Sequence, residues 1–410
     1  MTVIIHNADL IESVADALQY ISYFHPMDYI RALGDAYEAE QSPAAKDAIA
    51  QILTNSRMCA EGHRPLCQDT GIVNVFVKWG MDCRLEDISA SLQDVVDAGV
   101  RRAYLHPENK LRASVLADPA FTRRNTKDNT PCVLHVDLVP GSKVSVDVAA
   151  KGGGSENKSK FKMMNPSDNI IDWVVEMLPQ MGAGWCPPGM LGIGIGGTAE
   201  HCVLLAKQAL MEPIDMGPLK ARGPKNDIEA MRIEIFDKVN ALGIGAQGLG
   251  GLSTILDVKI MDAPCHAAGK PVAMIPNCAA TRHAHFTLDG TGPAYLEAPK
   301  LDEWPKVDWT PDAAAIRVDL DTLSPDVVAG WKQGDRLLLN GKMLTGRDAA
   351  HKQIADMLAK GEELPVSFKG RMIYYVGPVD PVGEEIVGPA GPTTATRMDK
   401  FMDMMLEQGL

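Results

Sequence analysis

Apolar runs typical of strands alternate with helical patterns along most of this chain, and no other feature limits its possible folds as strongly. Leu10, Val14, Leu18 and Ile21 recur at helical spacing and predict the first of two or three amphipathic helices within residues 8–60. The later helical patterns are 85–105, 166–181, a helix from Thr198, 227–242 and 346–361. The strand-like runs are 72–79, 132–139, 144–150, 190–197, 253–261, 270–276, 316–321 and 371–379. Such alternation predicts an α/β fold.

The alternation is interrupted between residues 299 and 312. This stretch mixes proline, tryptophan and charged residues without a period, and the patterns start again beyond it. We therefore expect two domains, residues 1–305 and 306–410, each large enough to bury a core. Turn residues between neighbouring apolar runs also predict two β-hairpins. One turns at Pro140 and Gly141, and the other turns at Asn340 and Gly341.

Charge and composition exclude several classes of partner. The formal net charge of −13 argues against nucleic acid or an anionic membrane as the main partner. The N-terminal sequence has no basic region followed by an apolar core, and no apolar run approaches the length of a membrane span. We expect a cytoplasmic protein whose eight cysteines remain reduced thiols. An anionic substrate would need a local group of cations.

Three cysteines lie in turns bounded by glycine or proline rather than in periodic elements: Cys67, Cys186 and Cys278. Most single cysteines are small buried hydrophobic residues, whereas a turn can present its thiolate to a ligand. The cysteines that we expect to be structural are Cys83, Cys132, Cys202 and Cys265. No C-x-x-C pair is present, so a ligand shared by the three turn cysteines would be assembled by the fold. Three thiolates suit either zinc or an iron–sulfur cluster.

The residues after Cys67 indicate how such a cluster would be used. A cluster of four irons with three cysteine ligands leaves one iron open, and this iron can act as a Lewis acid in the loss or addition of water. Gln68 and Asp69 follow Cys67 directly, so the same turn would bring an amide and a carboxylate to the substrate.

Two glycine motifs have the form of a dinucleotide fingerprint, GIGIGG at 192–197 and GIGAQG at 243–248. The match is weak, because the second motif follows a helix. The acidic residue expected after the first motif, Asp215, lies in a proline-bounded loop. We favour close packing of the backbone as the reason for these glycines.

The stretch KGGGSENKSK at 151–160 predicts a backbone that closely approaches another group, and its exposed amides could bind a carboxylate. The alternative is a solvated loop with its lysines pointing outward. Arg112, Arg347 and Arg397 are candidates to hold a dicarboxylate through planar forks, although an isolated arginine is more often a surface residue. His266 is either a proton carrier or a hydrogen-bonded core residue.

Seven motifs occur in an order that resembles the class I iron–sulfur fumarate hydratases and their L-tartrate dehydratase relatives. They are PLCQDTG, KGGGSENKSKF, CPPG with GIGGT, LGIGAQGLGG, CHAAGKPVAM with NCAATRH, GRDAAHK and GPTTATRMD. The resemblance covers nearly the whole chain. It implies an α+β large domain with a mixed sheet, followed by a smaller swivelling domain of β/β/α type. It also implies a cytoplasmic homodimer that serves the tricarboxylic acid cycle.

The resemblance assigns roles to particular residues of this sequence. The ligands of a [4Fe–4S] cluster fall on Cys67, Cys186 and Cys278. The positions that bind a small dicarboxylate substrate fall on Gln68, Arg112, Gly152, Gly153, Gly154, Arg347 and Arg397. The acid and base roles fall on Asp69, Thr393 and His266. The implied reaction is the reversible hydration of fumarate to L-malate.

One departure from the family and several alternatives remain. Family members continue past TTATRMD into a strand and a KGN turn whose lysine contacts substrate, whereas this sequence ends at Leu410. We therefore expect a fragment with weak turnover. L-tartrate or mesaconate chemistry is the nearest alternative, because the motifs specify only the shared 2-hydroxy-dicarboxylate end. A non-catalytic iron–sulfur sensor or electron carrier and an NAD-dependent dehydrogenase are more distant alternatives.

Overall fold

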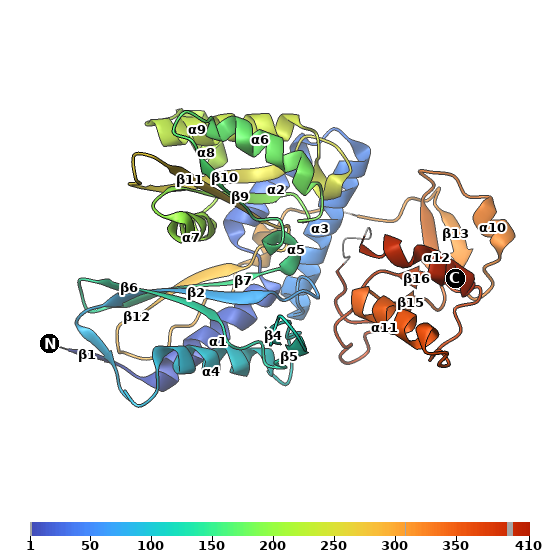
Figure 1. Ribbon diagram of the computed structural model, residues 1–410, viewed down its shortest axis with the longest axis horizontal. Coiled ribbons are helices and arrows are strands. Elements are labelled where there is room, and N and C mark those ends of the chain that lie inside the picture. The colour runs from blue at the N-terminus through green and yellow to red at the C-terminus, as the bar shows by residue number, and fades with distance from the viewer. Residues whose placement is uncertain (1, 308, 392–396) are drawn as a thin grey trace. The chain divides into compact units, whose positions relative to one another are not determined.

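Two compact units make up the chain, Met1–Val307 and Asp308–Leu410, and each is described by itself. The structure is a computed structural model that describes residues 2–307, 309–391 and 397–410 (Figure 1). Helices and mixed sheets occur together, which confirms the predicted α/β class. Among the described residues, no helix is both long enough and apolar enough to span a bilayer.

The first unit contains most of the regular structure. Its helices are α1 (Asn7–Tyr23), α2 (Met27–Ala39), α3 (Pro43–Gly62), α4 (Leu92–Tyr104), α5 (Gly153–Glu156), α6 (Ile170–Met181), α7 (Ala199–Ala209), α8 (Met216–Arg222) and α9 (Asp227–Ala241). Its strands are β1 (Val3–Ile5), β2 (Ile72–Gly80), β3 (Cys83–Leu85), β4 (Leu116–Ala117), β5 (Arg124–Asn125), β6 (Val133–Val139), β7 (Val144–Lys151), β8 (Lys160–Met164), β9 (Gly189–Gly196), β10 (Ile255–Ala263), β11 (Lys270–Asn277) and β12 (His283–Leu288).

One layer of the first unit is a four-stranded sheet with the order β12-β7-β2-β6. Helices α1 and α4 cover one of its faces (Figure 1), because Val73, Val75 and Val77 alternate on that side of β2 and are fully buried. The capping box of Ser91 and Asp94 starts α4 at residue 92, so this helix begins later than its predicted start at residue 85.

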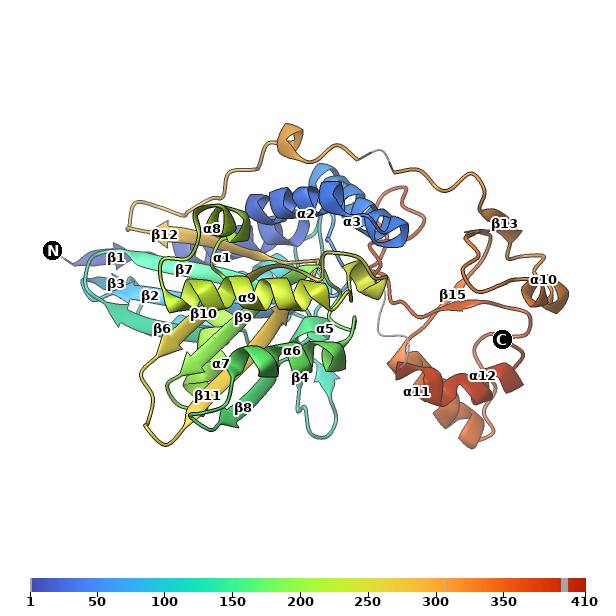
Figure 2. The same cartoon turned by 90° about the horizontal axis from the view of Figure 1, so that it is seen from above.

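The second layer is a sheet with the order β10-β9-β11-β8. Helices α6, α8 and α9 lie on one side of it and α7 lies on the other, with α9 running along β10 (Figures 1 and 2). The glycines of β9 face α7: a Cβ on Gly192 would lie 2.1 Å from the Ala206 carbonyl oxygen, and one on Gly194 would lie 2.0 Å from that of Cys202. Close packing therefore explains the GIGIGG motif, as predicted.

Both predicted hairpins are wrong, although their strands exist. β6 and β7 do not pair with each other, because β2 lies between them, parallel to β6 and antiparallel to β7. The connection at 140–143 passes around the end of β2, where the Gly80 amide donates to the Lys143 carbonyl oxygen at 2.9 Å. A Cβ on Gly80 would lie 2.4 Å from the Gly141 oxygen, so this crossing requires glycine.

The second unit is smaller and has short strands. Its elements are β13 (Ile316–Asp319), α10 (Pro325–Ala329), β14 (Leu337–Asn340), β15 (Leu344–Thr345), α11 (Asp348–Ala359), β16 (Ile373–Tyr374) and α12 (Met402–Glu407). β14 pairs with β13 and β15 pairs with β16, both in parallel, which is why the predicted hairpin at residue 340 is absent. Ile354, Phe368 and Met405 form the buried centre of this unit.

Candidate functional site

Strand pairing brings Cys186 and Cys278 together. β9 and β11 are antiparallel neighbours, and Met190 at the start of β9 pairs with Asn277 at the end of β11. Cys186 lies just before β9 and Cys278 directly follows β11, so both turns emerge at the same edge of the sheet. The amide of Ala279 donates to the carbonyl oxygen of Cys186 at 2.9 Å and joins the two turns.

The Cys186 turn has an unusual backbone that a second loop supports. Cys186 has a φ of +58°, in the left-handed region that non-glycine residues rarely adopt. The carbonyl oxygen of Pro187 accepts two hydrogen bonds from Gln247, one from the amide at 2.8 Å and one from the side-chain Nε2 at 2.7 Å. The motif GIGAQG at 243–248 therefore packs against this turn and helps to fix its conformation.

The Cys67 loop, residues 63–71, connects α3 with β2 and is held at several points. The amide of Leu66 donates to the Ser22 carbonyl oxygen at 2.8 Å. The hydroxyl of the buried Thr70 donates to the Arg112 carbonyl oxygen at 2.7 Å, and Tyr104 donates its hydroxyl to the Thr70 carbonyl oxygen at 3.0 Å. These bonds fix the loop beside the segment that contains Arg112.

Arg282 connects the Cys67 loop to the loop after Cys278. Its side chain is 4% exposed, and its Nη1 donates to the Asp69 carbonyl oxygen at 2.6 Å. Its Nε donates to the Ala150 carbonyl oxygen at 3.3 Å, at the end of β7. One buried guanidinium therefore joins three segments that are distant in the sequence.

The glycine turn at 152–154 contacts Asp69. The amide of Gly153 donates to Asp69 Oδ2 at 2.7 Å, and the amide of Gly71 donates to Oδ1 at 3.1 Å. A turn whose amides bind a carboxylate was predicted here, and the carboxylate is one of the protein's own side chains. The lysine before this turn, Lys151, is 2% exposed, which excludes the solvated-loop interpretation for it.

Lys151 extends toward the end of β11. Its Nζ donates to the Pro276 carbonyl oxygen at 2.7 Å and to Asn277 Oδ1 at 3.2 Å, directly before Cys278. Burial lowers the pKa of Lys151 to about 8, and the nearby thiol of Cys278 opposes this shift.

The three turn cysteines differ from the other five in exposure. Cys67, Cys186 and Cys278 are half-buried, Cys265 is exposed, and Cys59, Cys83, Cys132 and Cys202 are buried. Burial raises the pKa of Cys186 to about 12, and the thiols of Cys278 and Cys67 raise it further. The pKa of Cys67 is also raised, chiefly by burial, while Arg282 opposes the shift. The three thiols are thus close enough for their charges to interact.

The other predicted site residues of the first unit are not all near these thiols. Gln68 is 2% exposed in the Cys67 loop, and Arg112 is exposed with its backbone bonded to that loop. His266 is exposed in the turn between β10 and β11, where its Nδ1 accepts from the Ala268 amide at 3.1 Å. The whole of β11 separates His266 from Cys278, roughly 25 Å for eight residues at ~3.3 Å each.

In the second unit, Arg347 and Arg397 lie at the start of α11. Arg397 Nε donates to Asp348 Oδ1 at 3.0 Å, and Arg347 immediately precedes Asp348. The carbonyl oxygen of Arg347 accepts hydrogen bonds from the amide and the Nδ1 of His351, both at 2.9 Å. Thr393 lies outside the described residues.

Sequence reasoning missed the residues that support these loops: Lys151, Gln247 and Arg282. All three stand inside motifs that were recognised, so the signal was a basic or amide residue within a Gly-rich or Cys-containing turn. A sequence does not reveal that such a residue is buried, and burial is what makes these residues informative.

Comparison with known proteins identifies one family. Residues 11–287 match the family described as fumarate hydratase (Fumerase), and residues 290–410 match the fumarase C-terminus. A putative L(+)-tartrate dehydratase subunit alpha of Methanocaldococcus jannaschii is 36% identical over 279 residues, 66% of this chain and 94% of that protein.

Two relatives are similar over most of this chain. The aerobic class I fumarate hydratase of Escherichia coli (strain K12) is 31% identical over 390 residues, 91% of this chain and 69% of the relative. Fumarate hydratase 2 of Leishmania major is 30% identical over 430 residues, 100% of this chain and 72% of the relative. With both family matches placed in order along its length, this chain belongs to the class I fumarate hydratase family of hydro-lyases.

Proposed function

We propose that this protein catalyses the reversible hydration of fumarate to L-malate with a [4Fe–4S] cluster held by Cys67, Cys186 and Cys278. The observation that supports the proposal is that three half-buried cysteines lie in loops joined to one another, by the Ala279–Cys186 hydrogen bond and by Arg282, in a chain of this family. The similarity to class I fumarate hydratases of Escherichia coli and Leishmania major supports the choice of substrate.

The donor set suits a cluster better than a single metal ion. Within residues 2–307, 309–391 and 397–410, no three His, Cys, Asp or Glu side chains are placed to hold one ion. In a cubane cluster each thiolate binds a different iron, so its ligands stand further apart than the ligands of one zinc ion. When bound, the cluster would supply an open iron that polarises the substrate hydroxyl and carboxylate as a Lewis acid.

The residues around the cysteines would bind the substrate and move its proton. Asp69, whose carboxylate is fixed by two backbone amides, would take a proton from L-malate and return it to fumarate. Gln68 would donate its amide to the substrate, and Arg112 would hold a carboxylate through a planar fork. Thr393 is the other acid–base candidate, and as a hydroxyl it would need activation by its neighbours.

Arg347 and Arg397 would hold the second carboxylate of the substrate. Their shared position at the start of α11 supports a common role, because Arg397 is anchored to the residue that follows Arg347. We therefore assign a shared substrate-binding role to Arg347 and Arg397.

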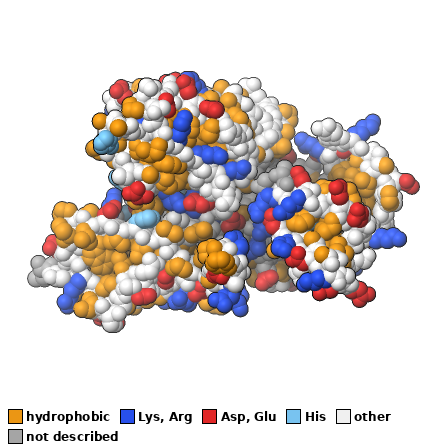
Figure 3. Space-filling model, viewed as in Figure 1, with side chains coloured by type: hydrophobic (Ala, Val, Ile, Leu, Met, Phe, Trp, Pro, Cys, Tyr) orange, Lys and Arg blue, Asp and Glu red, His pale blue; other side chains and the backbone are white. Residues whose placement is uncertain are grey.

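The predicted homodimer and the predicted role of His266 depend on each other. Because β11 separates His266 from Cys278, His266 could serve such a site only from a second copy of the chain. An apolar surface supports self-association: Val136 and Leu138 are exposed on one face of the edge strand β6, where hydrophobic side chains gather in Figure 3. A cytoplasmic location and a role in the tricarboxylic acid cycle complete the proposal.

Absorbance assays with anaerobically reconstituted protein test the proposed function. Fumarate should lose its ultraviolet absorbance as the double bond is hydrated, with no effect of NAD, and L-malate should give the reverse change. L-tartrate is the second candidate substrate, favoured by the Methanocaldococcus jannaschii relative, and mesaconate is the third. A protein that binds its cluster but hydrates none of these substrates would be a sensor or electron carrier, and the proposal would be wrong.

A further inference from the structure

Two buried cations beside the cysteine loops are bonded to no carboxylate among the described residues. Lys151 is 2% exposed and Arg282 is 4% exposed. Both donate hydrogen bonds only to neutral groups, namely backbone carbonyls, a serine hydroxyl and the side-chain amide of Asn277. In the part of the chain that the structure describes, neither forms an ion pair with an aspartate or glutamate.

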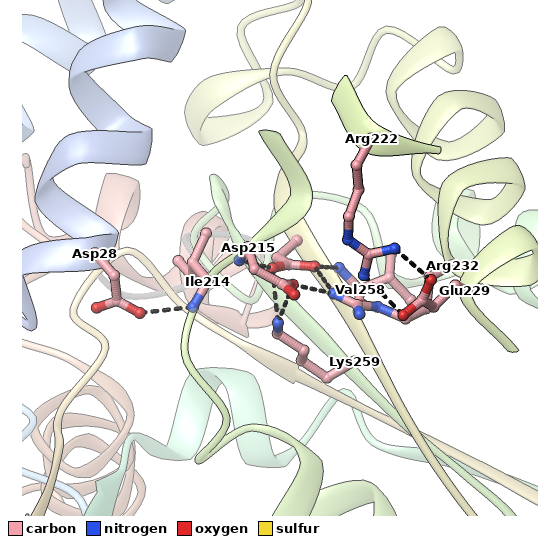
Figure 4. A network of polar contacts seen from close by, with 9 residues as sticks. Asp28, Ile214, Asp215, Arg222, Glu229, Arg232, Val258 and Lys259 are labelled. Atoms are coloured by element: carbon pink, nitrogen blue, oxygen red, sulfur yellow. Dashed lines mark hydrogen bonds and ion pairs between the residues drawn. The ribbon is translucent and has the colours of Figure 1, made fainter. Parts of the chain in front are cut away.

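A second pair of buried cations in the same unit is paired with carboxylates. Arg232 is 8% exposed and Lys259 is 6% exposed. Figure 4 shows both reaching Asp215, and both also contact Asp257, which is completely buried. Two cations there face two carboxylates, so the network is balanced.

A buried cation that contacts only neutral groups is costly, because hydrogen bonds to such groups replace its hydration but do not balance its charge. The nearby carboxylates form no bond to either cation: Asp69 accepts from two backbone amides, and one oxygen of Glu156 is paired with Lys207, so the charge of Glu156 acts on Lys151 only through space. The remaining groups that can become anionic are thiols. Lys151 holds the residue before Cys278, and Arg282 holds the loop that follows Cys67.

We infer that Lys151 and Arg282 are the counter-charges of the iron–sulfur cluster, and that they stabilise it and raise its reduction potential. The inference rests on the proposed function. Three thiolates outweigh the positive charge of the usual oxidised cluster core, so the assembled site is an anion that becomes more negative on reduction. A fixed buried cation favours the more negative state, and low exposure keeps water from screening the effect.

The test compares neutral variants with charge-keeping variants in the full chain, reconstituted anaerobically. Lys151→Gln and Arg282→Gln remove the charge while they keep a hydrogen-bond donor, and Met at each position is a second neutral variant. Lys151→Arg and Arg282→Lys keep the charge. The matched controls are Lys259→Gln and Arg232→Gln, which remove equally buried cations from the balanced network. Iron and sulfide per chain and the cluster reduction potential, followed by electron paramagnetic resonance, are the readouts.

In each neutral variant the equilibrium constant for reduction of the cluster should fall about tenfold. The reduction potential of a one-electron couple is then ~59 mV lower. These variants should also retain less iron than wild type. Charge-keeping variants and both controls should keep the wild-type potential. If the neutral variants bind as much iron and sulfide as wild type and keep its reduction potential, Lys151 and Arg282 are only hydrogen-bond donors and the inference is wrong. It is also wrong if only the KM for dicarboxylate rises, since the cations would then serve the substrate.

The same experiment separates this inference from the proposed function. If wild type takes up a cluster and hydrates fumarate while the potential is insensitive to both charges, only the inference fails. If wild type takes up no iron, the proposed function fails and the inference fails with it.

Discussion

Asp69 illustrates how backbone amides can fix the carboxylate of a proposed acid–base residue. Both of its carboxylate oxygens accept backbone amides, and its own carbonyl oxygen accepts from Arg282. Hydrogen bonds therefore fix both the side chain and the backbone of Asp69. An acid–base group needs such a fixed position. Single substitutions can test the proposed role of Arg112 and the effect of the buried His25 on stability.

The fork of Arg112 should matter more than its charge. Arg112→Lys keeps the charge but loses the bidentate geometry that suits a carboxylate. We expect kcat/KM for fumarate to fall by about 2 to 4 kcal/mol of transition-state stabilisation. The exposed Arg123→Lys variant is the control and should keep wild-type kinetics. An equal response of monocarboxylate and dicarboxylate substrates would show that Arg112 is only structural.

His25 should make the folded protein sensitive to acid. Its Nδ1 is 2.8 Å from Ser56 Oγ and its Nε2 is 2.9 Å from the Ala279 carbonyl oxygen, and burial lowers the pKa of His25 to about 3. Below pH 6.5 the unfolded chain binds a proton that the folded chain does not, so the free energy of unfolding decreases as pH falls. The loss between pH 7 and pH 5 should be about 2 kcal/mol.

Denaturant titrations at the two pH values measure this loss. His25→Gln should remove most of it, whereas the exposed His201→Gln variant should keep the wild-type pH dependence. Equal pH dependence in His25→Gln and wild type would contradict the prediction.

At the scale of elements, local patterns identified most strands and helices but not their partners. The runs at 132–139 and 144–150 look like a hairpin because a Pro-Gly turn joins them, yet β2 inserts between them. A Pro-Gly turn influences the pairing of only a few residues. β2 precedes β6 by about sixty residues, and the burial of its apolar side chains favours its pairing with both β6 and β7. β12 and α8 were not predicted at all, since the first lies in a His-rich run and the second in a short proline-bounded segment.

The contact between β9 and α7 should not tolerate a methyl group. A Cβ on Gly194 would lie 2.0 Å from the Cys202 carbonyl oxygen and 2.7 Å from the Ala206 amide nitrogen. Both are backbone atoms, so Gly194→Ala should cost about 1 to 3 kcal/mol of unfolding free energy, or more. Gly217→Ala in α8 is the matched control, because its Cβ would meet nothing within 4 Å. Equal thermal midpoints for the two variants would contradict this account of the packing.

At the scale of the whole molecule, the three turn cysteines could be selected from the sequence because turn context is local. Their convergence could not be predicted, because it depends on the antiparallel pairing of β9 and β11. The buried cations Lys151 and Arg282 could not be recognised either, since burial follows from the packing of several loops. Conversely, His266 was expected at the site from its motif, whereas it lies at the other end of β11 from Cys278.

The roles proposed for Arg347 and for the three cysteines predict separable defects. Arg347→Gln changes the second unit, whereas all three cysteines belong to the first. We expect kcat/KM to fall by about 2 to 4 kcal/mol, as for a lost charge-assisted pair, with no change in iron content. Arg336→Gln, which removes an exposed ion pair with Asp312, is the control. Loss of iron in Arg347→Gln would contradict a role of Arg347 in substrate binding alone.

Iron content in cysteine variants tests the central claim most directly. Anaerobically reconstituted wild type should hold about four irons per chain, and so should the buried-cysteine controls Cys83→Ser and Cys202→Ser. Cys67→Ser, Cys186→Ser and Cys278→Ser should each lose most of that iron. Full iron in any of these three variants, or stoichiometric zinc in place of iron in the wild type, would contradict the three-cysteine cluster.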